Sequence, residues 1–134
     1  AAITSAHLHH QALPAATLDE TIDIVSRLLA GEVGEPPSRL AALFGILTAT
    51  RRKEFTLAFG MKSISKTHLV HPACSQKDRK PFPHRVPLSD QAIEVLLAAN
   101  PSQTGPLFPS PYWAHRPIRI DNPYHTVSRL TDAK

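Results

Sequence analysis

Thirteen prolines in a chain of 134 residues limit how long any helix or strand can be. Proline lacks a backbone N–H and fixes φ, so it breaks helices and is confined to the edges of sheets. Its share is about twice the usual ~5%. We therefore expect short elements joined by many turns. The hydrophobic fraction of 42% still provides enough apolar side chains for the core of one domain.

Two helices are expected before residue 50. Thr17 and Glu20 have the spacing of a capping box, and Gly31 is a typical helix stop. The segment between them carries apolar residues at helical spacing, namely Leu18, Ile22, Val25, Leu28 and Leu29. Ser38 is expected to cap a second helix, which is apolar on most sides and so should be buried at the centre.

The stretch 48–60 predicts a third short helix, and a hairpin is expected after it. The strands of the hairpin are expected at 66–72 and 84–88, with a polar, basic turn between them. Pro87 restricts the second strand to an edge or to a short length.

The last third of the chain returns to helices. Ser89 is expected to cap a helix that ends at Asn100, and a long loop follows. Asp121 is expected to start a final helix with Pro123 in its first turn. The predicted fold class is α+β, mainly helical, with a small antiparallel sheet of two to three strands.

Positive charge is concentrated in one window of the sequence. Residues 51–85 hold nine lysines and arginines against two acidic residues, a net +7, whereas 1–50 are net −3 and 86–134 are neutral. A concentrated basic patch favours a polyanion partner, most simply nucleic acid. A solvated basic face with no partner is an equally weighted alternative.

Two groups in this window could contact phosphate. Arg51 and Glu54 lie at i, i+3, so on a helix the carboxylate could hold the guanidinium in one orientation. Lys77, Arg79 and Lys80 lie in the predicted hairpin turn, where a lysine could neutralise a phosphate or protonate a leaving oxygen. An ordinary surface ion pair and a solvated turn are the competing interpretations.

Several phrases, taken in order, resemble the tyrosine recombinases of the phage-integrase class. They are "ILTATRRKEF", "QKDRKPFPHRVPLSDQAIEVL", "PLFPSP" and "RPI", and "HHQALP" at 9–14 resembles the entry to the catalytic domain in prophage and genomic-island integrases. The resemblance covers nearly the whole chain. It implies an entry segment at 1–15 and a partial, incomplete integrase-type catalytic domain at 16–134.

The resemblance also implies roles for individual residues. Arg51 matches the first catalytic arginine, which binds the scissile phosphate, and Glu54 matches the acidic residue that supports its turn. Lys77 best matches the hairpin lysine that helps the 5′-oxygen leave, with Lys80 as a competitor. Further contacts to DNA are expected from Arg52, Lys53, Arg79, Lys80, His84 and Arg85.

The implied partner is the phosphate backbone of double-stranded DNA, with other recombinase protomers as a second partner. The resemblance implies no metal and no cofactor, because the covalent phosphotyrosine link conserves the bond energy. The implied location is the bacterial cytoplasm, at the nucleoid. No apolar run approaches the 18 residues of a membrane span.

The sequence also departs from the family pattern. Ala49 replaces the usual glycine after threonine, and "LAFGMK" replaces the usual Leu-x-Trp. The His/Lys-x-x-Arg box and the tyrosine nucleophile of the family's second half have no match, since His125 and Arg129 are four apart rather than three and are interpreted as ordinary. Tyr112 and Tyr124 lie outside any nucleophile context. We therefore expect a truncated or excised fragment that is inactive alone, and its status as an enzyme stays open.

Three alternatives remain at this point. One is a DNA-backbone-binding module without chemistry, and another is a structural helical domain whose basic face is incidental. The third is a metal site at His68, His71 and Cys74, with further donors at His7, His9 and His10. It is disfavoured because residues three apart on a strand point to opposite faces.

Overall fold

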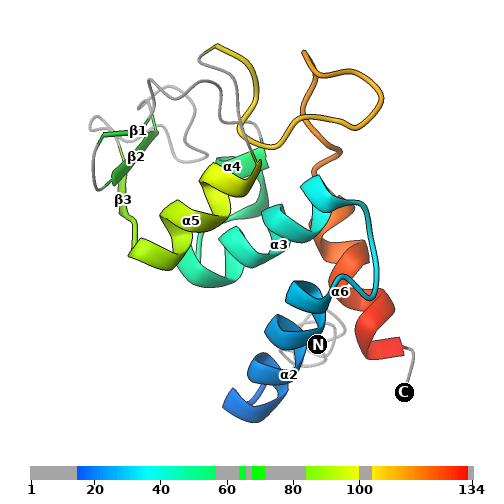
Figure 1. The fold of residues 1–134 in the computed structure, drawn as a ribbon. Helices are drawn as coiled ribbons and strands as arrows, with labels where there is room; N and C mark the ends of the chain where they lie inside the picture. Colours follow the sequence, from blue (N-terminus) through cyan, green and yellow to red (C-terminus); the bar gives the residue numbers. More distant parts are fainter. Residues whose placement is uncertain (1–14, 57–63, 66–67, 72–83, 100–103, 133–134) are drawn as a thin grey trace, which may run out of the picture.

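The computed structural model describes residues 15–56, 64–65, 68–71, 84–99 and 104–132. The helices in this part of the chain are α2 (Leu18–Ala30), α3 (Pro36–Thr48), α4 (Arg52–Thr56), α5 (Asp90–Ala99) and α6 (Asn122–Asp132) (Figure 1). The strands are β1 (Ile64–Ser65), β2 (His68–His71) and β3 (His84–Pro87). The expectation of a mainly helical chain is confirmed.

Helix α2 begins and ends as its sequence predicts. The Thr17 hydroxyl accepts the Glu20 N–H at 3.2 Å, and the Glu20 carboxylate accepts the Thr17 N–H at 2.8 Å, so the capping box is complete. Gly31 ends the helix with φ of 74°, and its N–H donates to the carbonyls of Arg27 and Leu28. Both local predictions are confirmed.

Helix α3 starts three residues earlier than expected. Ser38 was expected to cap it, but the helix begins at Pro36, and Ser38 is buried inside it. Glu35 occupies the N-cap position without a side-chain hydrogen bond. The physical reason is that proline fits the first helical turn, where no N–H donor is needed, so the two prolines at 36–37 set the start.

Helix α3 is the centre of the fold. It contacts α2, α4, α5 and α6 (Figure 1). Its Phe44 packs against Phe55 of α4 and Phe108 of the loop before α6, with ring centroids 5.5 to 6.1 Å apart in the three pairs. All three rings are buried, and each contributes roughly 1.5–3 kcal/mol by leaving water. This aromatic cluster fixes both α4 and the loop before α6 against α3.

The three strands pair in the order β1-β2-β3, and both pairings are antiparallel. Strand β3 pairs with β2 alone among the described strands, so Pro87 lies at an edge, where its missing N–H costs no ladder bond. Val86 of this strand and Leu88, just after its end, are buried in the core. The Ser89 hydroxyl then accepts the Ala92 N–H at 3.2 Å, which confirms the predicted cap of α5.

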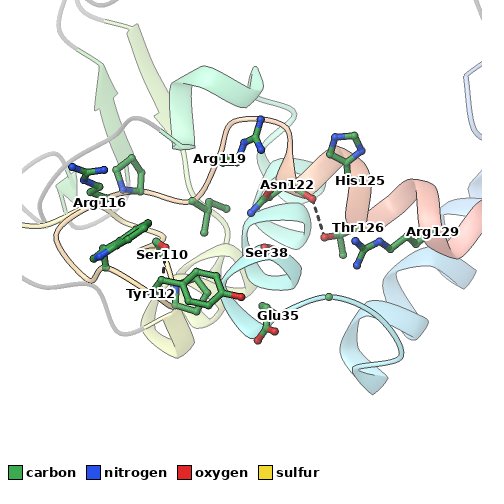
Figure 2. A pocket seen from close by; sticks show the side chains of 15 residues that line it. Glu35, Ser38, Ser110, Tyr112, Arg116, Arg119, Asn122, His125, Thr126 and Arg129 are labelled. Atoms are coloured by element: carbon green, nitrogen blue, oxygen red, sulfur yellow. Dashed lines mark hydrogen bonds between the residues drawn. The ribbon is translucent and has the colours of Figure 1, made fainter.

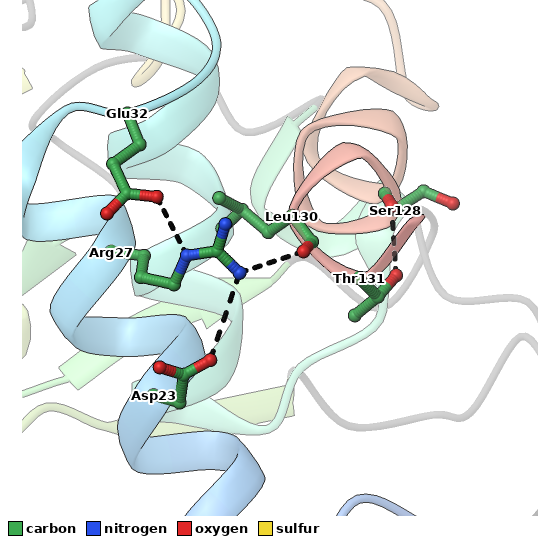
Figure 3. Close-up of polar contacts among 6 residues, drawn as sticks. All are labelled: Asp23, Arg27, Glu32, Ser128, Leu130 and Thr131. Carbon is green, nitrogen blue, oxygen red and sulfur yellow. Dashed lines mark hydrogen bonds and ion pairs between the residues drawn. The ribbon is translucent and has the colours of Figure 1, made fainter. Parts of the chain in front are cut away.

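Helix α6 has Pro123 in its first turn, as expected, and packs Leu130 into a second cluster with residues of α2 and α3. Figure 3 shows a hydrogen bond between α2 and α6, in which the Arg27 guanidinium donates to the Leu130 carbonyl at 2.8 Å. The same guanidinium binds Glu32 at 2.7 Å. Among the described residues, no helix is long and apolar enough to cross a membrane.

Candidate nucleic-acid interface

The turn that precedes Arg51 has a backbone conformation that favours glycine. Ala49 ends α3 with φ of 53° and ψ of 29°, and its N–H donates to the Gly45 carbonyl at 2.9 Å. A left-handed residue with a Cβ costs roughly 1–2 kcal/mol. The Thr48 hydroxyl donates to the Phe44 carbonyl at 2.8 Å and lies 2.8 Å from the Thr50 hydroxyl. These contacts define the path of the chain up to Arg51.

Glu54 holds the main chain at Arg51. The Arg51 N–H donates to Glu54 Oε2 at 2.9 Å, and the Glu54 N–H donates to the Arg51 carbonyl at 2.9 Å. The sequence-based interpretation had the carboxylate orient the guanidinium, whereas this hydrogen bond is made to the backbone. The carboxylate therefore fixes the point from which the exposed Arg51 side chain extends.

The next residue, Arg52, is tied to another helix. Its guanidinium binds the Asp121 carboxylate at 2.8 Å and lies 5.7 Å from the centroid of the Tyr124 ring. Within the described part of the chain we find no ion pair for Arg51 or Lys53, both exposed. Two of the three consecutive basic residues are thus exposed cations without an ion pair among the described residues.

The other predicted contacts are only partly placed. Arg85 is exposed on β3, and the backbone of His84 pairs with that of His71. Lys77, Arg79 and Lys80 lie outside the described residues, as does Cys74 of the candidate metal site. The structure therefore brings Arg51, Arg52, Lys53 and Glu54 together on one turn. The hairpin lysine lies outside the described residues, so the structure does not place it relative to this turn.

A cavity of about 420 Å³ lies between the start of α3, the loop at 110–119 and helix α6 (Figure 2). Its charged lining residues are Arg116, Arg119, Arg129 and Glu35. His125, interpreted as ordinary from the sequence, also lines it. The sequence did not indicate this cavity, because the charges of residues 86–134 sum to zero. Three of the four cations in this segment are nevertheless the lining arginines, at 116, 119 and 129.

Comparison of the chain with protein-family models, with curated proteins and with solved structures gives no match.

Proposed function

We propose that this chain binds the phosphate backbone of duplex DNA as the first half of a tyrosine-recombinase-type catalytic domain. The observation that carries the proposal is the Arg51 turn, where an exposed guanidinium extends from a main chain that the Glu54 carboxylate holds at 2.9 Å. A guanidinium on a fixed base loses less freedom when it binds a phosphate with two parallel hydrogen bonds.

The backbone at Ala49 is a second, independent support. The resembled family has glycine at this place in its Thr-Gly-x-Arg phrase, and here the residue has a φ of 53°. Glycine adopts this conformation without steric cost. The conformation is thus compatible with the glycine of the resembled family, although the residue that adopts it here is different.

The proposed division of labour follows from exposure and charge. Arg51 binds the phosphate, and Lys53 and Arg85 add exposed cations for neighbouring phosphates. Lys77, with Lys80 as the competitor, is proposed to serve the leaving oxygen. The 134 residues hold no His-x-x-Arg box, so we propose that this chain alone binds DNA without cutting it.

The test is a salt titration of duplex binding combined with a nicked suicide substrate. Phosphate binding predicts an affinity that falls steeply and linearly on a logarithmic salt scale, because counterions are released. It also predicts no covalent protein–DNA adduct. An affinity that does not change with salt would contradict the phosphate contacts, and an adduct would contradict the proposal that this chain alone is inactive.

A further inference from the structure

The cavity beside α6 has an aromatic rim on a closed loop. Tyr112 and Trp113 are 80% and 57% exposed, and their rings make an edge contact with centroids 6.4 Å apart. The Ser110 N–H donates to the Arg116 carbonyl at 2.7 Å, and the Arg116 N–H donates to the Trp113 carbonyl at 2.9 Å. These bonds close the loop on itself, so two large rings are presented to solvent from a defined main chain.

The rim and walls of the cavity carry positive charge. The Arg116 guanidinium lies 5.5 Å from the centroid of the Trp113 ring, and the Arg129 side chain extends from α6 toward the cavity (Figure 2). In the described residues we find no ion pair for Arg116, Arg119 or Arg129.

The arginines of the cavity differ in this respect from two other arginines of the described surface. Arg27 and Arg52 both have carboxylate partners within 3 Å. Glu35 is the single acidic residue among those that line the cavity, so its lining has an excess of two formal positive charges. The net positive charge of the lining thus favours the binding of an anion.

We infer that this cavity binds one unpaired nucleotide of a single-stranded nucleic acid, with the base on the Tyr112–Trp113 rim and the phosphate on the arginines. A volume of 420 Å³ is in the range of small-molecule sites, roughly 300–1,000 Å³. Exposed aromatic rings next to cations are the combination by which proteins hold single strands. Within a duplex both faces of each internal base are covered by stacking, so internal base pairs cannot use this rim.

The inference does not rest on the recombinase proposal, since it involves other residues and another form of nucleic acid. Trp113 is the single tryptophan of the chain, so its fluorescence reports on this site alone. Titration with a short oligothymidylate is expected to quench the tryptophan emission to saturation. A duplex with no unpaired bases is expected to leave the emission unchanged.

Two variants that keep Trp113 give the matched comparison. Arg129→Ala removes a lining cation and is expected to weaken oligothymidylate binding about tenfold, the usual size of a charged hydrogen bond. His115→Ala changes an exposed residue of the same loop that does not line the cavity, and its affinity is expected to equal that of the unchanged chain.

Stacking is tested separately with a labelled oligothymidylate and fluorescence anisotropy. Trp113→Ala is expected to weaken binding at least about fivefold, whereas Trp113→Phe keeps a stacking ring and retains most of the affinity. Any of three results would overturn the inference: no saturable quenching, equal quenching by the duplex, or equal affinities for Arg129→Ala and His115→Ala. The first and third of these results do not depend on whether Arg51 binds duplex DNA.

Discussion

The Arg52 guanidinium and the Asp121 carboxylate lie 2.8 Å apart, although 69 positions separate the two residues in the chain. This contact joins the start of α4, which carries the proposed duplex surface, to the start of α6, which forms one wall of the cavity. Tyr124 lies against the same guanidinium, with its ring centroid at 5.7 Å. One exposed polar contact therefore connects the elements that carry both proposed sites.

The Arg52–Asp121 pair should contribute little to stability despite its short distance. Both side chains are about half exposed, at 53% and 54%, so water and salt screen their attraction. A double-mutant cycle with Arg52→Ala and Asp121→Ala is expected to give a coupling of about 0.2–1 kcal/mol that shrinks as salt increases. A coupling that stays the same in high salt would show that the pair is effectively buried.

Ala49→Gly should stabilise the fold. It removes the steric cost of a Cβ at φ of 53°, and the greater freedom of glycine in the unfolded chain offsets part of the gain. We expect a net increase of about 0.5–1 kcal/mol in the free energy of unfolding, measured by denaturant titration. A loss of stability would mean that residue 49 is not left-handed in solution.

Gly34 and Gly31 form a matched pair for testing how closely residue 34 approaches Thr126 of α6. Both have positive φ, but a Cβ at Gly34 would lie 2.9 Å from Cγ2 of Thr126, whereas at Gly31 the nearest atom is 3.5 Å away. Alanine at either position has the strain of a positive φ, and at Gly34 its Cβ must also displace the Thr126 side chain of α6. We expect Gly34→Ala to lower the free energy of unfolding by about 1 kcal/mol or more beyond Gly31→Ala. Equal losses would show that Gly34 and Thr126 are not in close contact.

Thr56 has a buried hydroxyl for which the described part of the chain offers no hydrogen-bond partner. Burying such a group without a partner costs roughly 1–3 kcal/mol, and valine has the same branched shape without the polar atom. Thr56→Val is therefore expected to leave the free energy of unfolding unchanged or to raise it by about 1 kcal/mol. A clear loss of stability would imply that the hydroxyl has a partner in solution.

The local starts and stops of helices could be predicted from the sequence. Thr17 with Glu20, Gly31, Ser89 and Pro123 all act within one helical turn, so their chemistry is visible in a short window of residues. The prediction that Ser38 caps α3 was wrong, because it considered the serine hydroxyl and not the two prolines before it.

Tertiary relationships could not be predicted in this way. The apolar stripe of α2 has helical spacing, yet Leu18, Ile22 and Leu29 are exposed in the structure. Periodicity shows which residues share a face and does not show what covers that face. The cavity was missed for a related reason, since Glu35 and Arg129 come from segments that only the fold brings together.

Duplex binding by the Arg51→Ala variant, measured across a range of salt concentrations, tests the central claim most directly. The Glu54 hydrogen bond at this turn is made to the backbone N–H of residue 51, which alanine retains, so the fold should stay intact. Removal of one phosphate contact predicts weaker binding to every duplex sequence and a salt slope shallower by about one. Unchanged affinity and unchanged slope in a folded Arg51→Ala variant would contradict the account.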